Sequence, residues 1–195
     1  MDYTQTIAER TVEYIDDGHI YLVDGKIVPS ITQLLSRKFG GKYEGIPRAA
    51  LESAARKGTE LHEAIQKLCE TGFYPEDMKE VRNFLWLQKQ YGFEVVANEV
   101  PVILFWGDEP VAAGRLDLVL RMNGQLGGAD IKRTSALDKD YLAYQLNLYR
   151  KAYRQSYGLE WEFLRGVHLR EDVRKFVSIP IDESLADEII IRYGG

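Results

Sequence analysis

The sequence has one cysteine and no long apolar run, and both absences exclude classes of protein. Cys69 is the single cysteine among 195 residues. It cannot form an internal disulfide, and this chain alone cannot hold a cysteine-based zinc site or an iron–sulfur cluster. No apolar run is long enough to span a membrane, and the start, Met1–Gln5, lacks the basic and apolar segments of a signal peptide. We therefore expect a cytoplasmic protein with no part in a membrane.

An excess of positive charge is also missing. The formal net charge is −5, so the chain has no overall attraction to nucleic acid, which counts against a protein that coats it. The net charge does not exclude a local cluster of basic residues around a binding site. In addition, acidic residues that bind a metal ion no longer repel an anionic substrate once the ion is bound. The composition, 45% hydrophobic and 28% charged, is typical of a globular protein, and the length fits one domain.

The strongest local signal lies between Ala113 and Thr134, where the pattern predicts one β-hairpin. Asn123-Gly124 favours a type I′ turn, because both central residues of this turn need a positive φ. With these two residues as the turn, Asp117 lies directly opposite Asp130 in the neighbouring strand. The hairpin therefore brings two carboxylates together.

The same register places Arg115 opposite Lys132, on the face that carries the two carboxylates. The alternation of side chains in a strand then puts the leucines of the first strand on the other face; these are Leu116, Leu118 and Leu120. We thus expect one polar and one apolar face.

Two opposed carboxylates destabilise a sheet unless their repulsion is offset. A divalent cation that bridges both would offset it, and a site made of hard oxygen ligands suits Mg²⁺ or Mn²⁺. The alternative is a solvated polar face that Arg115 and Lys132 neutralise. Spacing alone leaves both interpretations open.

The rest of the chain predicts a mixed succession of strands and helices. Ser30 and Gln33 form a capping-box pattern that begins a short helix, followed by a glycine-rich basic loop, 37–42, which either touches a phosphate backbone or is merely solvated. Gly58 lies inside a helical pattern and marks either a kink or a close approach by another element. The expected elements are strands over 19–23, 26–29, 93–105, 161–169 and 173–180, and helices over 31–36, 48–70, 76–90, 138–157 and after Asp182.

Two further features bear on the hairpin. A loop centred on Asp108 would pair Glu99 with Asp117 and add a third acid to the row, although Pro101 weakens that register. The four-residue spacing of the helix after Asp138 puts a glutamine and two tyrosines on one face, either reaching a site or simply exposed; these are Tyr141, Gln145 and Tyr149.

The order of these motifs resembles the PD-(D/E)XK nuclease superfamily, specifically its RecB-type branch, which is common in bacterial recombination enzymes and phage exonucleases. The motifs that carry the resemblance are Gly58–His62, Glu99–Pro101, Gly114–Asp117, Asp130–Lys132 and Gln145–Tyr149. The resemblance implies an α/β (α+β) fold with a restriction-endonuclease-like core, a central mixed sheet with an antiparallel hairpin, and flanking helices. We expect a single domain, with residues 1–46 as an N-terminal β-hairpin and short helix extension and 47–195 as the core.

The resemblance also implies roles for individual residues. Asp117 and Asp130 would be metal ligands together with the backbone carbonyl of Ile131, and Lys132 would be the catalytic lysine. His62 matches the histidine that joins the metal site in this branch, and Glu99 matches a frequent acidic position. Gln145 and Tyr149 match a helical motif that supports the active site and the substrate; Arg115 and Tyr141 are further candidates for substrate contacts.

Three features depart from the family pattern. The third motif has Asp130 as its acid, which shortens the ligand arm relative to glutamate. The preceding Gly127-Gly128 replaces bulky apolar residues and suggests a bulge that would shift the register. The cysteines that hold an iron–sulfur cluster in some members are absent.

The function implied is a Mg²⁺- or Mn²⁺-dependent DNA nuclease, with an exonuclease of phage or bacterial recombination and repair favoured. The implied partners are DNA and a recombination protein, in the cytoplasm of a bacterium or of a phage-infected host, and a homo-oligomer stays open. The alternatives are a non-catalytic DNA-binding or assembly subunit that keeps the fold, and a different metal-dependent hydrolase built on a similar hairpin.

Overall fold

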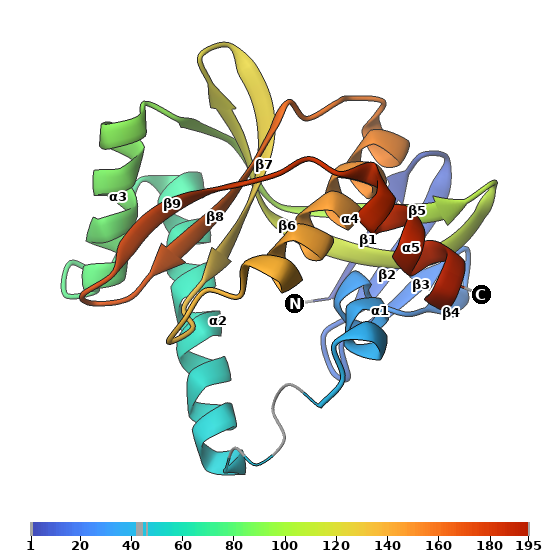
Figure 1. The fold of residues 1–195 in the computed structure, drawn as a ribbon, viewed down its shortest axis with the longest axis horizontal. Coiled ribbons are helices and arrows are strands. Elements are labelled where there is room, and N and C mark those ends of the chain that lie inside the picture. Colours follow the sequence, from blue (N-terminus) through green and yellow to red (C-terminus); the bar gives the residue numbers. More distant parts are fainter. Residues whose placement is uncertain (1, 42–44, 46, 195) are drawn as a thin grey trace.

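A computed structural model describes residues 2–41, 45 and 47–194, and in it the chain forms two β-sheets with helices around them (Figure 1). The first sheet is antiparallel, in the order β1 (Tyr3–Ile7), β2 (Arg10–Ile15), β3 (Ile20–Val23) and β4 (Lys26–Val28). The second is mixed, with β7 and β8 parallel, in the order β5 (Glu94–Trp106), β6 (Glu109–Met122), β7 (Gln125–Lys132), β8 (Phe163–Leu169) and β9 (Arg174–Ile179). The helices are α1 (Ile31–Lys38), α2 (Arg48–Thr71), α3 (Lys79–Tyr91), α4 (Lys139–Tyr157) and α5 (Glu183–Tyr193).

This architecture of two sheets and surrounding helices agrees with the α/β (α+β) class expected from the sequence. The predicted capping box is present, because the Gln33 amide donates to Ser30 Oγ while the Gln33 side chain accepts from the Ser30 amide. Of the predicted basic loop 37–42, Lys42 lies outside the described residues. Over the described part of the chain, we find no helix with the length and apolar character needed to span a membrane.

The helices cover the two faces of the five-stranded sheet separately. One apolar cluster joins a face of the sheet to α1, α4 and α5, and a second joins the other face to α2 and α3. In Figure 1, α2 and α3 accordingly lie on one side of the sheet and α1 and α5 on the other. A third cluster packs the first sheet against Ile103, Phe105 and Ala113 of the β5–β6 hairpin. Burial of these apolar side chains is the main force that holds the layers together.

The hairpin of β6 and β7 has the predicted register. The pairs run from Met122↔Gln125 to Leu118↔Ala129 without a shift, so the bulge suggested by Gly127-Gly128 does not form. The glycines serve a different purpose, because a Cβ on Gly128 would lie 2.1 Å from the Trp161 ring. Both glycines leave room for aromatic rings, since a Cβ on Gly127 would lie 2.4 Å from the Phe163 ring.

Beyond Leu118↔Ala129, β6 and β7 no longer pair among the described residues. In the same region Glu99 stands between the paired residues Asn98 and Val100 of β5 and has a φ of 48°, a left-handed conformation that interrupts strand alternation. The prediction that the three leucines of β6 share one face is wrong, as their packing shows. Leu116 packs in the cluster with α4, whereas Leu118 and Leu120 pack in the cluster with α2 and α3.

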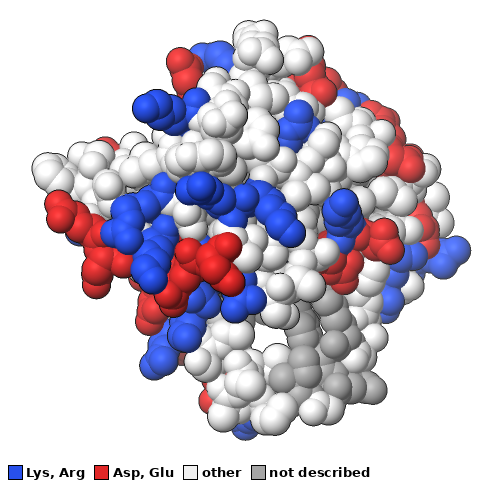
Figure 2. Space-filling view, turned by 60° about the vertical axis from the view of Figure 1, so that its left-hand side comes forward, with Lys and Arg blue, Asp and Glu red and all other residues white. Residues whose placement is uncertain are grey.

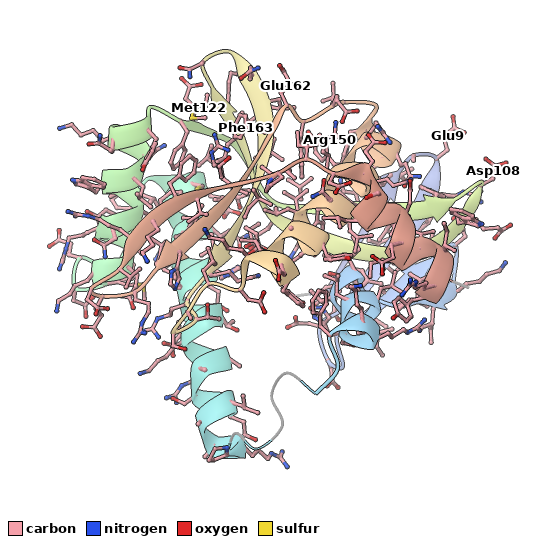
Figure 3. The ribbon with its side chains drawn as sticks, viewed as in Figure 1. Glu9, Asp108, Met122, Arg150, Glu162 and Phe163 are labelled. Carbon is pink, nitrogen blue, oxygen red and sulfur yellow. The ribbon has the colours of Figure 1, made fainter. Side chains whose placement is uncertain are left out.

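The N-terminal part contains more strands than the single hairpin expected. β1 and β2 precede that hairpin and are joined at Ala8-Glu9, with φ values of 48° and 63°. Such a turn normally carries asparagine or glycine, so no local signal in the sequence predicts it. Arg10 donates to the Asp108 carbonyl oxygen at 3.3 Å. The tips at Glu9 and Asp108 accordingly lie at one end of the molecule (Figure 3).

Candidate metal centre

Three side chains from three elements converge where β6 and β7 separate. They are His62 of α2, Glu99 of β5 and Asp117 of β6, each with a ligand atom within 4.8 Å of the others. His62 Nδ1 lies 3.5 Å from Asp117 Oδ1 and 3.8 Å from Glu99 Oε1. We call these three residues the metal triad.

The backbone of Ile131 orients two members of the metal triad. His62 Nε2 lies 3.2 Å from the Ile131 carbonyl oxygen, and since a carbonyl oxygen only accepts, Nε2 carries the hydrogen. The Nδ1 lone pair of the neutral ring is then available to a cation. The Ile131 amide donates to Asp117 Oδ2 at 2.6 Å, which leaves Oδ1 turned toward His62. The Ile131 carbonyl, implied as a metal ligand, is thus engaged by His62.

Glu99 is fixed from the opposite side. Arg115 Nε donates to Glu99 Oε2 at 2.6 Å, and the Glu99 side chain is only 14% exposed. Because one oxygen is held by the guanidinium, the other faces His62 Nδ1. The two carboxylates of the metal triad therefore each use one oxygen for protein contacts and direct the other toward the histidine.

The charges around His62 favour a proton on it when no cation is bound. Burial lowers the pKa of His62, but the negative charges of Asp117, Asp130 and Glu99 outweigh burial and raise the pKa to about 9. A group that attracts a proton this strongly lies where positive charge is stabilised. A divalent cation at Nδ1 would replace that proton.

Beside the metal triad, Lys132, whose side chain is 24% exposed, forms an ion pair with the buried Asp130. Lys132 Nζ lies 2.6 Å from Asp130 Oδ2. Burial raises the pKa of Asp130 to about 6, although Lys132 opposes the shift, and the Asp117 charge adds to it. Burial lowers the pKa of Lys132, but Asp130 and Asp117 raise it above its ordinary value. Lys132 is therefore charged at neutral pH.

The expected residues of α4 line the same region from one face of the sheet. The Tyr149 hydroxyl donates to the Arg115 carbonyl oxygen at 3.1 Å, and a Cβ on Gly114 would lie 3.1 Å from the Tyr149 ring. Gln145 is buried and, among the described residues, its Oε1 has no hydrogen-bond partner. Tyr141 is close enough to Lys132 to affect its pKa, and its ring packs edge-on against Phe39.

The metal triad fits one divalent ion by geometry and chemistry. Metal–ligand bonds of about 2.0–2.2 Å place neighbouring ligand atoms roughly 3–4 Å apart, and the distances of 3.5 and 3.8 Å from His62 Nδ1 lie in that range. A set of one imidazole nitrogen and two carboxylates suits Mn²⁺ better than Mg²⁺, since Mg²⁺ prefers oxygen ligands.

The structure thus assembles most of the predicted site, with a different division of roles. His62, Glu99 and Asp117 come together, whereas Asp130, expected as the second ligand, lies outside the metal triad and pairs with Lys132. Its role as a ligand stays a prediction. The Glu99–Arg115 ion pair was missed, although the expected register makes the two residues diagonal neighbours across β5 and β6.

A hollow lies near α3 and β8. It is about 300 Å³ in volume and is lined by Lys79, Arg133, Arg170, Glu171 and Asp172. Lys79 pairs with Glu171, and Arg133 pairs with Glu80, so its charges are largely compensated. Acidic and basic side chains likewise intermingle on the face shown in Figure 2. This hollow does not bring together metal-ligating groups as the metal triad does.

Comparisons with known proteins leave the family of the chain unassigned. No family model matches the sequence, and no curated protein does. Among solved structures, the crystal structure of SSO0001 is similar over 84% of this chain and 75% of that chain, with 20% sequence identity and a TM-score of 0.40.

Proposed function

We propose that the protein is a metal-dependent DNA nuclease with a restriction-endonuclease-like core of the RecB type. One observation carries the proposal: the metal triad lies beside a charged lysine paired with a buried aspartate, at the point where two strands separate. The matching sequence motifs support it. On this proposal DNA is the substrate, and a recombination protein or a second copy of the chain is the expected partner.

Hydrolysis of a phosphodiester requires an activated water, neutralisation of the phosphate charge and support for the departing oxygen. A Mg²⁺ or Mn²⁺ ion held by His62, Glu99 and Asp117 would supply a more acidic bound water and a positive charge near the phosphate. The protein contributes the orientation, since the Ile131 backbone fixes His62 and Asp117 and Arg115 fixes Glu99.

Lys132 contributes positive charge in this proposal. Its raised pKa keeps the ammonium protonated at neutral pH, so it stabilises negative charge that develops on the phosphate and orients the attacking water. Asp130 holds the ammonium in place at 2.6 Å. On α4, the Tyr149 hydroxyl donates to the Arg115 carbonyl oxygen of β6, and Gln145 is buried.

The Asp130–Lys132 ion pair also weighs against a non-catalytic subunit. A buried pair is rarely more stable than apolar residues of the same volume, so Asp130 and Lys132 give little to a protein that only binds DNA. Their retention next to three ligand-type side chains favours chemistry.

A cleavage assay tests the proposal. The full chain is incubated with linear duplex, circular duplex and single-stranded DNA, each with Mg²⁺, with Mn²⁺ and with a chelator. We expect metal-dependent cleavage of at least one substrate, and a loss of at least 100-fold in Asp117→Ala and Lys132→Ala, since the loss of one charge-stabilising group costs about 10²–10³ in rate.

Two controls make the assay decisive. Asp108→Ala and Lys26→Ala remove exposed charges at hairpin turns away from the metal triad and should cleave like the parent. DNA binding without cleavage under every condition would favour the assembly subunit instead. Cleavage that survives both site substitutions would place the activity elsewhere.

A further inference from the structure

Glu99 holds its place in the metal triad at the expense of an unfavourable backbone. Its φ of 48° is uncommon for a residue with a side chain, and such a conformation persists only where surrounding contacts determine it. The Asp117 carboxylate has the same sign of charge as Glu99 and lies close to it, because an oxygen of each faces His62 Nδ1. Something must therefore hold the Glu99 carboxylate against both strain and repulsion.

Arg115 is placed to do so. Its Nε donates to Glu99 Oε2 at 2.6 Å, and two thirds of its side chain is buried, with 33% exposed. A guanidinium is always charged and donates from a planar, rigid group, so it both neutralises and orients a carboxylate. Lysine at this position would supply the charge without the fixed direction.

Arg115 is in turn held by the first sheet. Its guanidinium carbon lies 5.5 Å from the centre of the Tyr14 ring, a cation–π distance. The Tyr14 ring packs at 5.4 Å from the Tyr3 ring and at 4.9 Å from the Tyr21 ring. Its hydroxyl is hydrogen-bonded with His19 Nδ1 at 2.9 Å. Tyr14 is therefore a buried, fixed surface against which Arg115 lies.

We propose that the first sheet positions the metal centre through Tyr14 and Arg115, with Arg115 as a positioning residue for Glu99. The inference rests on the proposed metal centre and is independent of DNA hydrolysis. It assigns the N-terminal sheet a role in the site, and it gives Arg115 a positioning role in place of the substrate contact expected from the sequence. Removal of Arg115 or of the Tyr14 ring releases the Glu99 carboxylate and weakens the metal site.

Calorimetric titration of the metal-free full chain with Mn²⁺ tests the proposal. Arg115→Met and Tyr14→Leu should each raise the Mn²⁺ dissociation constant about 10–100-fold, as loss of an orienting partner typically does. Tyr14→Phe keeps the ring and loses only the hydroxyl, so it should raise the Mn²⁺ dissociation constant less than Tyr14→Leu does. Arg121→Met changes an exposed arginine on the same strand and is the matched control. Unchanged Mn²⁺ affinity in Arg115→Met would overturn the proposal.

A crystal structure of metal-free Arg115→Met provides a readout that needs no metal binding. We expect Glu99 to leave its left-handed conformation and its carboxylate to move away from His62; a Glu99 unchanged from the parent refutes the positioning role. Arg115→Lys, expected to lose part of the affinity, serves if Arg115→Met does not fold. If the parent binds no Mn²⁺, the proposed function fails, and the position of Glu99 still decides this inference.

DNA binding separates the two roles of Arg115. If Arg115 contacts a phosphate, Arg115→Met weakens DNA binding and reduces the salt dependence by about one unit of slope while Mn²⁺ affinity stays the same. That result contradicts the proposal. A positioning role instead changes Mn²⁺ affinity and leaves metal-free DNA binding and its salt slope unaltered.

Discussion

His62 links the charge of the site to the stability of the whole protein. Its pKa is raised from 6.5 to about 9, because Asp117 and Glu99 outweigh the effect of burial. Between these values the folded protein binds a proton that the unfolded chain has released, so stability is present below pH 6.5 and is lost as pH rises toward 9. In a chelator, we expect the free energy of unfolding to fall by about 1–2 kcal/mol from pH 7 to 8.5, measured by urea denaturation.

The control for this prediction is His62→Gln, which cannot titrate. Its free energy of unfolding should stay nearly constant over the same interval. The limit of pH 8.5 avoids Cys69, whose pKa burial raises from 9.0 to about 11 and which therefore contributes a further loss only above pH 9. An equal slope in the parent and His62→Gln would show that another group is responsible.

The Asp130–Lys132 pair makes a second prediction. Lys132→Met leaves Asp130 buried without a cation, which should lower the free energy of unfolding by about 3 kcal/mol at pH 8. The pKa of Asp130, already raised to about 6 by burial, then rises further. Since the neutral acid is tolerated, the loss should shrink as pH falls toward 5. Urea denaturation at both pH values measures the difference.

A double variant shows whether the buried charge is the cause. Asp130→Asn combined with Lys132→Met should be more stable at pH 8 than Lys132→Met alone. Lys79→Met removes the cation of an exposed pair with Glu171 and should cost less than about 1 kcal/mol. If the double variant is no more stable than Lys132→Met, lost packing rather than charge explains the effect.

Gly58 in α2 and Gly128 in β7 differ in the space available for the methyl group of an alanine. Helix α2 runs unbroken through Gly58, and a Cβ there would have no neighbour within 4 Å among the described residues. Within that part of the chain, Gly58 therefore does not permit a close approach, contrary to one interpretation of the sequence. Gly58→Ala should raise the free energy of unfolding by about 0.5–1 kcal/mol. Gly128→Ala should lower it by about 1–3 kcal/mol, because its Cβ would lie 2.1 Å from the Trp161 ring.

Thermal and urea unfolding of both variants measure these opposite effects. Gly128→Ala combined with Trp161→Phe should recover part of the loss, because the smaller ring makes room for the methyl group. A destabilised Gly58→Ala would contradict the open surroundings of Gly58.

Elements with a local signal could be predicted, and features that depend on distant contacts could not. Asn123-Gly124 specified the turn and the β6–β7 register, and Ser30 with Gln33 specified the start of α1. The turn at Ala8-Glu9 has no such signal, because neither residue is of a type that favours the positive φ found there. Gly127-Gly128 indicated a special position, but only the structure shows that aromatic rings need the space.

The candidate site follows the same division. The order of the motifs predicts that His62, Glu99, Asp117 and Asp130 belong to one site. Which of them form the metal triad, and which pairs with Lys132, depends on long-range geometry. Strand alternation alone predicts that Asp117 and Asp130 share one site. In the structure, the pairing of β6 with β7, followed outward from the turn, ends at Leu118↔Ala129, one residue short of the two aspartates. Asp117 then accepts from the Ile131 amide and Asp130 pairs with Lys132. Because the sequence pattern does not reveal that separation, it predicts Asp117 and Asp130 as two equivalent metal ligands.

The whole chain should unfold as one cooperative unit, although its two sheets have separate strands. The β5–β6 hairpin belongs to both, since Ile103 and Ala113 pack against the first sheet while Val102 and Ala112 pack in the cluster with α4. A parallel bridge from Ser30 to Ala113 adds a backbone link. The first sheet therefore cannot separate without exposing buried apolar surface of the second, which opposes independent unfolding.

Native-state hydrogen exchange tests this cooperativity. Amides of β2 and β3 should exchange with a free energy of opening close to that of β8, and calorimetry should show a single transition. Mn²⁺ should raise both protection levels together by RT ln(1 + [Mn²⁺]/Kd), about 2.7 kcal/mol at one hundred times Kd, because the metal triad and its Arg115–Tyr14 support connect the two sheets. Protection that rises with Mn²⁺ in β8 but not in β2 would show that the first sheet opens independently of the metal centre.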